Sequence, residues 1–269
     1  MKAVLAPTDF SDVSVNAVKY AAGLAMSLDA ELVLMHVNEY VFAYSDAGVV
    51  DFVMEEHSDD KLAALEKQML ADTEGKLRIK KYISSGQFQD ELRSFCKTTQ
   101  PFAIVMGTHD ELNGFDRLLM ESQSVFASKS LDYPVIIVPR NATWHSISSV
   151  GFACDLKNIY HIPAERIKDI QETFRAALHI VHISKNKQQE DKDAVQALLL
   201  QPSLMTNNTE LHVIEHDDVE VGIEVFAKDF HIDLIILLAK DYGLIGNIFH
   251  KSQSKKMIMH PKMPLMILH

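Results

Sequence analysis

The sequence predicts an α/β protein built from two similar halves, each a doubly wound parallel sheet. Two observations predict it: short apolar segments alternate with amphipathic helical segments along the chain, and the order of segments in the first half recurs in the second. Such alternation is typical of parallel strands covered by helices on both faces, because right-handed crossovers place the helices there. A length of 269 residues fits about two domains.

Matching segments of the two halves are separated by two constant offsets. Early in each half the offset is 146 residues, as between Met35-His36-Val37 and Val181-His182-Ile183. Late in each half it is 130, as between Ser122-Gln123-Ser124 and Ser252-Gln253-Ser254. The chain is therefore predicted to be a duplicated unit, with about 16 additional residues between the second strand and the C-terminal third of the first copy. Two further matches pair Asp9-Phe10 with Asp155-Leu156, and Pro134 with Pro264.

In the first half, the short apolar run Ala3–Pro7 predicts the first strand. Ser11 is a favoured N-cap residue directly before apolar positions at helical spacing, which predicts a helix over Asp12–Ser27. The same reasoning predicts strands at Glu31–Val37, Leu77–Ile83, Phe102–Gly107 and Val135–Val138, and helices at Asp59–Glu74, Gln87–Thr98 and Glu121–Leu131.

The second half repeats this order, so its elements follow in the same sequence. Strands are predicted at Val150–Ala153, His179–Ile183, Leu211–Glu215, Leu234–Ala239 and Leu265–Leu268, and helices near Ala164–Ala176, Asp191–Leu200, Val219–Asp229 and Ser252–Met259. Pro139–Ser146 is predicted to link a first domain (residues 1–140) to a second (residues 147–269). Its Trp144 is expected to cover the contact between the domains.

Composition and charge argue against several classes of protein. The chain has 37 acidic and 26 basic side chains and a net charge of -11, which disfavours binding to nucleic acid or to an anionic membrane surface. No apolar run approaches the roughly 20 residues of a membrane-spanning helix, and no targeting segment is recognised. Cys96 and Cys154 are predicted to be buried free thiols. We therefore expect a cytoplasmic protein with no nucleic-acid or membrane partner.

Three segments of the first half are predicted to converge where its strands end. Ligands of open parallel sheets bind at the carboxyl ends of the strands, where the strand order reverses. These segments are Pro7-Thr8-Asp9, Val37-Asn38 and Gly107 onward. Asp9 could accept a hydrogen bond from a base amino group or a ribose hydroxyl; in the alternative, Asp9 or Ser11 caps the next helix. His36 is expected to be a packed, hydrogen-bonded side chain.

Short segments in the same order in both halves carry a resemblance to a known family. They are Val4–Ser11, Leu34–Val37, Ile104–His109 and Phe115–Val138 in the first half, and Phe152–Asp155, Val181–Ile183 and Ile248–Pro264 in the second. Together they resemble the universal stress protein domain, which covers nearly the whole chain twice. The resemblance implies a Rossmann-like, adenine nucleotide alpha hydrolase-like fold with a five-stranded parallel sheet in each domain. It also implies that the domains pack through their last strands as an intramolecular pseudo-dimer.

Many members of that family bind ATP through a loop of pattern G-x2-G-x9-G-[S/T]. Glycines let backbone N–H groups approach phosphates, and the following helix N-terminus favours an anion. In the first half Gly107 matches the first glycine and Asp110 stands at the second; the loop is one residue longer than the pattern, around Asn113-Gly114, so the third glycine aligns with Glu121. A carboxylate about 5 Å from a phosphate charge costs roughly 3 kcal/mol, whereas a helix N-terminus returns about 0.3–2 kcal/mol. The loop is therefore expected to be degenerate.

The second half departs further from the family's loop. Leu237 or Leu238 replaces its first glycine and Lys251 its last. No cofactor is expected to be required, and ATP in the first domain is the alternative. The candidate nucleotide-binding residues are Pro7, Thr8, Asp9, Val37, Gly107, Ser122 and Ser124.

Motifs for catalysis or metal binding are not recognised. The chain has no GxSxG, P-loop or HExxH pattern, and His212 and His216 fall in or just after a predicted strand, where a spacing of four does not share a helical face. We expect no metal and no catalytic residue. The favoured function is a non-catalytic stress-response protein that binds or interacts through a degenerate nucleotide site. The alternatives are an ATP- or AMP-binding switch in the first domain and a slow ATP hydrolase using His109-Asp110.

The last strand of each half bears on the partners of the chain. Val135–Val138 and Leu265–Leu268 are apolar edges that would promote association if exposed, and the tandem arrangement lets them cover one another. A homodimer of whole chains and an unidentified protein partner are further expectations. The aromatic-rich insert around Val41–Asp60 is expected to cover a cleft or contact a partner, or else to form an amphipathic helix on its own core.

Overall fold

Two sets of five strands make up the main sheet in a computed structural model of the chain. The structure describes residues 2–38, 41–44, 50–53, 57–108, 123–124, 126–128, 130–154, 162–184, 204–238 and 261–268. The first half contributes β1 (Ala3–Pro7), β2 (Glu31–Asn38), β5 (Arg78–Ser85), β6 (Ala103–Gly107) and β7 (Val135–Val138). The second contributes β8 (Ser149–Ala153), β9 (Ala177–Ser184), β10 (Thr209–Glu215), β11 (Leu234–Leu238) and β12 (Leu265–Leu268).

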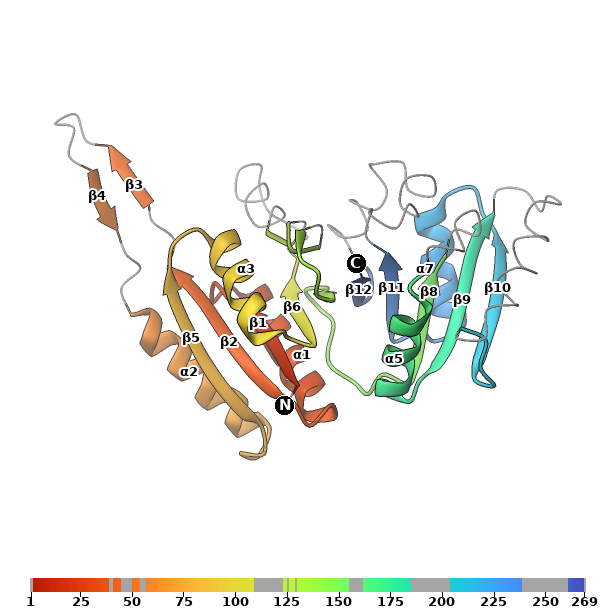
Figure 1. The fold of residues 1–269 in the computed structure, drawn as a ribbon, viewed down its shortest axis with the longest axis horizontal. Helices are drawn as coiled ribbons and strands as arrows, with labels where there is room; N and C mark the ends of the chain where they lie inside the picture. The colour runs from red at the N-terminus through yellow and green to blue at the C-terminus, as the bar shows by residue number, and fades with distance from the viewer. Residues whose placement is uncertain are drawn as a thin grey trace.

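The two halves have the same strand order and join at the centre of one ten-stranded sheet (Figure 1). The first half runs β5-β2-β1-β6-β7, and the second runs β10-β9-β8-β11-β12. Pairs within each half are parallel, whereas β7 and β12 pair antiparallel. The predicted tandem, doubly wound α/β fold is confirmed, and the last strands of the two halves are the ones that meet.

The pairing register confirms the repeat residue by residue. In the first half Pro7 pairs with Met35, and in the second Ala153 pairs with Val181, so both partners are shifted by 146. At the junction Ile136 pairs with Met266, and the flanking pairs are symmetric about them. This symmetry arises because β7 and β12 are equivalent strands of the two copies, 130 residues apart.

The additional residues of the first copy lie between β2 and β5. The backbone N–H of Gly86 donates to the carbonyl of Asn38 at 3.1 Å, and that of His216 donates to Ser184 at 3.0 Å. The two acceptors, Asn38 and Ser184, are 146 residues apart in the chain, and the two donors, Gly86 and His216, are 130 apart. The 16 additional residues of the first copy therefore lie between Asn38 and Gly86. The longer segment between Asn38 and Gly86 contains an antiparallel hairpin of β3 (Val41–Tyr44) and β4 (Val50–Val53), which extends away from the main sheet in Figure 1. A helix at these residues is therefore ruled out; a partner or a cleft for the insert stays a prediction.

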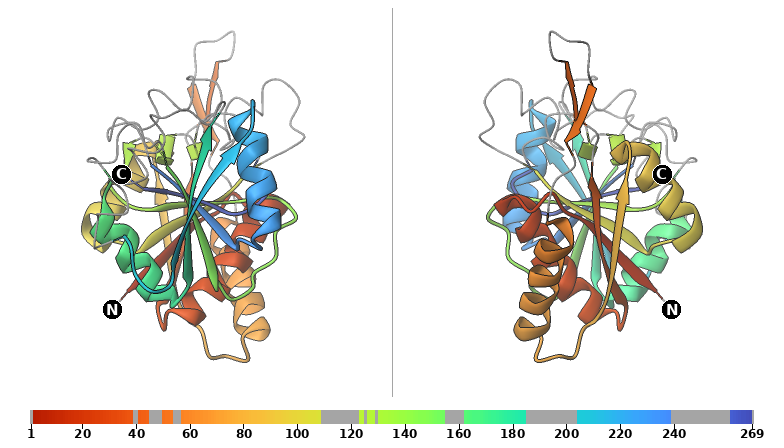
Figure 2. Two further views of the ribbon diagram at one scale, coloured as in Figure 1. Left: turned by 90° about the vertical axis from the view of Figure 1, so that its right-hand side faces the viewer. Right: turned by 90° about the vertical axis from the view of Figure 1, so that its left-hand side faces the viewer.

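Helices cover both faces of the sheet, which is strongly twisted (Figure 2). Side chains of α1 (Asp12–Ser27), α2 (Ser58–Asp72) and α5 (Ala164–Phe174) pack on one face. Those of α3 (Phe88–Thr99) and α7 (Val219–Asp229) pack on the other. The inner strands β1, β6, β7, β11 and β12 are therefore buried on both faces, which explains why they are nearly continuous apolar runs. The edge strands β5 and β10 are partly exposed and carry polar residues.

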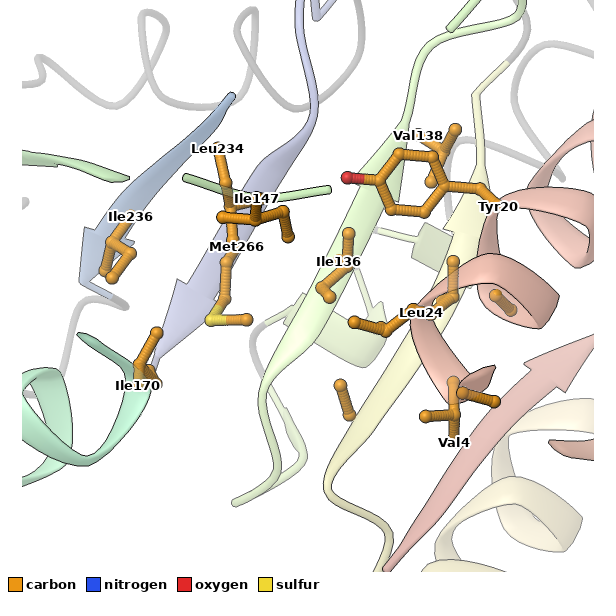
Figure 3. Packing of buried hydrophobic residues seen from close by; sticks show 14 of the residues in the cluster. Val4, Tyr20, Leu24, Ile136, Val138, Ile147, Ile170, Leu234, Ile236 and Met266 are labelled. Carbon is orange, nitrogen blue, oxygen red and sulfur yellow. The ribbon is translucent and has the colours of Figure 1, made fainter. Parts of the chain in front are cut away.

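Successive strand residues feed two apolar clusters, one on each face. Val4 and Ala6 belong to one cluster, and Leu5 between them belongs to the other. Each cluster contains residues of both halves, and Figure 3 shows Ile136 and Met266 side by side within one of them. The two halves consequently share their core across the β7–β12 junction.

The linker lies along the first half. The side-chain amide of Asn16 in α1 donates to the carbonyls of Pro139 and Ala142 at 3.2 and 3.0 Å. The indole of Trp144 packs edge-on against the ring of Tyr20, with centroids 5.0 Å apart, and occupies the space beside Gly23. These contacts place Trp144 on α1, and it packs against the apolar cluster that contains residues of both halves. That it covers the contact between the domains stays a prediction. The domain bounds 1–140 and 147–269 stay a prediction.

Several predicted elements fall wholly or partly outside the described residues. The helices at Asp191–Leu200 and Ser252–Met259 are among them, whereas the described residues of Glu121–Leu131 are helical except at its end. Cys96 and Cys154 are buried free thiols, as predicted. No helix among the described residues is long and apolar enough to cross a membrane.

Candidate functional site

The carboxyl ends of three adjacent strands bring most of the predicted site residues to one edge of the sheet. β1 lies between β6 and β2, so the strand order reverses beside it, as ligand sites of such sheets require. The hydroxyl of Ser124 donates to the carbonyl of Gly107 at 3.3 Å, which fixes this serine at the end of β6. The residues at this edge are Pro7, Thr8, Asp9, Val37, Gly107 and Ser124; Ser122 lies outside the described residues.

Thr8 is buried and bonded within the turn that follows β1. Its backbone N–H donates to Met35 of β2 at 2.8 Å. Its hydroxyl lies 2.9 Å from the hydroxyl of Ser14 and accepts from the backbone N–H of Phe10 at 3.0 Å. These bonds hold the start of α1 against the strand ends.

Asp9 is exposed, and it organises the first turn of α1. One of its carboxylate oxygens accepts from the backbone N–H and the hydroxyl of Ser11 at 3.1 and 2.6 Å. The Ser11 hydroxyl in turn accepts from the backbone N–H of Ser14 at 3.3 Å, so Ser11 is the N-cap residue. The capping role of Ser11 is confirmed, and a nucleotide contact by Asp9 stays a prediction.

His36 is a buried, hydrogen-bonded residue, as expected. Its Nδ1 donates to the carbonyl of Thr8 at 2.8 Å, and its Nε2 lies 3.1 Å from the side-chain amide of Asn38. Asn38 also accepts from the hydroxyl of Ser58 at 2.6 Å. The ring packs against Phe10, with centroids 4.5 Å apart. These contacts position the imidazole as part of the framework of this edge.

Gly107 has a packing role at the end of β6. A Cβ atom built on it would lie 2.6 Å from Cγ1 and 2.7 Å from the carbonyl oxygen of Val13. The first turn of α1 can approach the strand this closely only because no side chain is present. Next to it, Thr108 is buried, and its hydroxyl has no hydrogen-bond partner among the described residues.

The register identifies the counterpart of Gly107 in the second half. Gly107 pairs with Val138 in the first half, and Leu238 pairs with Leu268 in the second. Because Val138 and Leu268 are equivalent, Leu238 rather than Leu237 replaces the glycine. Leu238 is buried, so its side chain packs where the first half has none.

A cluster of potential metal ligands lies elsewhere in the second half. His179 of β9 and Glu210 and His212 of β10 have ligand atoms within 4.8 Å of one another. In the sequence His212 stands four residues from His216, but in the structure its ring lies beside that of His179. The signal in the sequence is the alternation Glu210-x-His212, which places both side chains on one face of a strand.

The chain matches the model of the universal stress protein family over residues 1–139. It is 28% identical over 141 residues to a universal stress protein of Methanocaldococcus jannaschii, a match that covers 52% of this chain and 82% of that protein. A crystal structure of a universal stress protein from Archaeoglobus fulgidus DSM 4304 is similar across both halves, with a TM-score of 0.69, 18% identity and coverage of 99% of this chain and 95% of that one.

A functionally unknown protein from Pseudomonas aeruginosa PAO1 also has a similar fold. Its TM-score is 0.61 at 13% identity, and the match covers 100% of this chain and 92% of that one. Both likenesses extend over the complete tandem arrangement of strands and helices described above. These likenesses show the shared fold, and the match of the family model over residues 1–139 shows that this chain belongs to the universal stress protein family.

Proposed function

We propose that the chain acts as a non-catalytic stress-response protein that binds or interacts through a degenerate nucleotide site. The observation that carries the proposal is the equivalence of Gly107 and Leu238. Main-chain amides approach a phosphate closely where glycine leaves space. A buried leucine at that point supports the loss of the phosphate cradle in the second half.

Charge supports a similar loss in the first half. In sequence, Asp110 and Glu121 stand where the loop pattern has glycines. Each carboxylate near a phosphate opposes binding by roughly 3 kcal/mol at about 5 Å. The close approach of Val13 also explains by packing alone why position 107 is a glycine, without any bound phosphate.

The surroundings of His36 support a non-catalytic role. A general base must be placed to take a proton from a reacting group. Both ring nitrogens of His36 instead lie within hydrogen-bonding distance of Thr8 and Asn38. The imidazole therefore holds the strand ends together.

Isothermal titration calorimetry with Mg-ATP tests the proposal on the full chain. We expect no binding at micromolar concentrations for the natural sequence. The matched variant Asp110→Gly/Glu121→Gly returns glycine to both positions and removes two carboxylates, so it is expected to bind at least tenfold more tightly. Micromolar binding by the unmodified chain would overturn the degenerate-site proposal.

A nucleotide switch in the first domain is the second candidate. The buried Thr108 hydroxyl, without a partner among the described residues, and Ser124 beside Gly107 favour it, because both offer polar groups at the end of β6. Protein purified without added nucleotide and then denatured would release adenine absorbance, and Ser124→Ala would reduce it.

A slow ATP hydrolase is the other alternative. Its turnover would be lost in Asp110→Ala, and undiminished turnover in that variant would rule out a catalytic role for Asp110.

A further inference from the structure

We propose that His179, Glu210 and His212 form a binding site for a divalent transition-metal ion such as Zn²⁺. The three residues belong to the neighbouring strands β9 and β10, which lie beside α7 on the right of Figure 1. They are near the amino ends of their strands. The cluster is thus independent of the nucleotide site proposed at the carboxyl ends of the first half.

The strand register brings the three residues together. Glu210 pairs directly with His179 across the parallel β9–β10 ladder. His212 is two residues further along β10, so its side chain lies on the same face as that of Glu210. Rigid strand positions therefore supply all three potential ligands, which favours a preorganised site.

The distances suit a metal ion. Nδ1 of His179 lies 3.1 Å from Nε2 of His212. Oε2 of Glu210 lies 3.7 Å from Nδ1 of His179 and 3.6 Å from Nε2 of His212. Ligand atoms bound tetrahedrally at 2.0–2.1 Å from one ion are about 3.3 Å apart. An ion can therefore enter among the three atoms with side-chain shifts of a few tenths of an ångström.

The donor set selects the class of ion. Two imidazole nitrogens and one carboxylate oxygen suit zinc and its first-row neighbours, whereas calcium and magnesium prefer all-oxygen sites. Three protein ligands also leave a position for water, as in zinc sites that are open to solvent. The proposed occupant is thus a borderline divalent cation that keeps at least one exchangeable ligand.

Two phenylalanines hold the imidazoles in place. The ring centroid of His212 lies 4.1 Å from that of Phe230 and 5.4 Å from that of Phe226. The ring centroid of His179 lies 5.9 Å from that of Phe230. The histidine side chains are 13% and 14% exposed, but that of Glu210 is 67% exposed. This arrangement combines an apolar wall with a solvent-accessible carboxylate, which gives the ion a route of entry.

Titration of the chelator-treated full chain with Zn²⁺ by isothermal titration calorimetry tests the proposal. We expect one ion per chain at micromolar or tighter affinity. His212→Gln and Glu210→Gln each remove a ligand and are expected to weaken binding at least about tenfold. Because Glu210 is exposed, Glu210→Gln tests the site without disturbing the core. His231→Gln, an exposed histidine after α7, is the matched control and is expected to bind like the unmodified chain.

The Co²⁺-loaded protein supplies a second readout. A site with two histidines, one carboxylate and water is expected to give an intense visible absorption, which Glu210→Gln should abolish. Failure to bind one Zn²⁺ per chain would overturn the proposal, as would unchanged affinity in either Glu210→Gln or His212→Gln. The histidine pair would then be a hydrogen-bonded contact between strands.

Discussion

Ile136 of β7 and Met266 of β12 pair with each other at the midpoint of the ten-stranded sheet, and both are fully buried. They are equivalent positions of the two copies, so the junction is symmetric about them. Figure 3 shows their side chains within the apolar cluster that contains residues of both halves. A duplicated unit has thereby used the last strand of each copy to cover the other's exposed edge.

A shared core predicts that the two halves unfold together. Met266→Ala is expected to lower the free energy of unfolding by about 2–5 kcal/mol, because it leaves a cavity at the junction. Trp144 packs on the first half, so its fluorescence reports that half while circular dichroism reports the whole chain. In urea, both signals should shift together.

Met26→Ala is the control for this prediction. Met26 is an exposed residue of α1, so its truncation is expected to change stability by less than about 0.5 kcal/mol. If Met266→Ala moved the circular dichroism transition but left the Trp144 transition in place, the two halves would be independent folding units.

Gly23 in α1 is expected to reverse the usual effect of a glycine-to-alanine change. Alanine normally stabilises a helix interior by up to about 1 kcal/mol. Here the added methyl would lie 2.1 Å from Cδ1 of Trp144, so Gly23→Ala should destabilise the protein. In a Trp144→Ala background the same change should become neutral or stabilising. Additive effects of the two substitutions, measured by thermal unfolding, would contradict this contact.

Cys96 predicts a loss of stability at alkaline pH. Burial raises the pKa of its thiol from 9.0 to about 12, so above pH 9 the unfolded chain releases this proton while the folded chain retains it. Stability is therefore complete below pH 9 and falls by up to about 1.4 kcal/mol per pH unit as the pH rises toward 12.

Urea unfolding at pH 8 and pH 10.5 measures that dependence. The unmodified chain should lose about 2 kcal/mol more over this interval than Cys96→Ala, which lacks the titrating thiol. Equal losses in the two proteins would show that the Cys96 thiol does not contribute. The comparison is between the changes in unfolding free energy from pH 8 to pH 10.5, so the constant cost of the cavity left by alanine cancels.

Ser11 is expected to stabilise α1 by its cap. Ser11→Ala removes the acceptor for the backbone N–H of Ser14 and the hydroxyl that donates to Asp9, and should cost about 1 kcal/mol of unfolding free energy. Ser11→Asp keeps an acceptor at the N-cap and should cost less. Equal losses in the two variants, measured by chemical denaturation, would argue against capping.

Elements with strong local signals could be predicted from the sequence. The run Ala3–Pro7 and the Ser11 cap gave the bounds of β1 and the start of α1, and helical spacing gave its end at Ser27. The apolar last strands and the family resemblance likewise predicted that β7 and β12 meet at the junction. These features depend on neighbouring residues or on matches within the chain.

Features that depend on pairing across strands could not be predicted in the same way. Only the register distinguishes Leu238 from Leu237 as the counterpart of Gly107. Likewise, His179 meets Glu210 because β9 and β10 are adjacent in one particular register. The contact of Trp144 with Gly23 required the path of the linker over α1.

A crystal structure grown with millimolar Mg-ATP is the most direct test of the central claim, that the phosphate cradle of this family member is degenerate. We predict no ordered triphosphate at the ends of β6 and β11, beside Gly107 or Leu238. A triphosphate beside Gly107, with its oxygens bound by main-chain amides, would contradict the account.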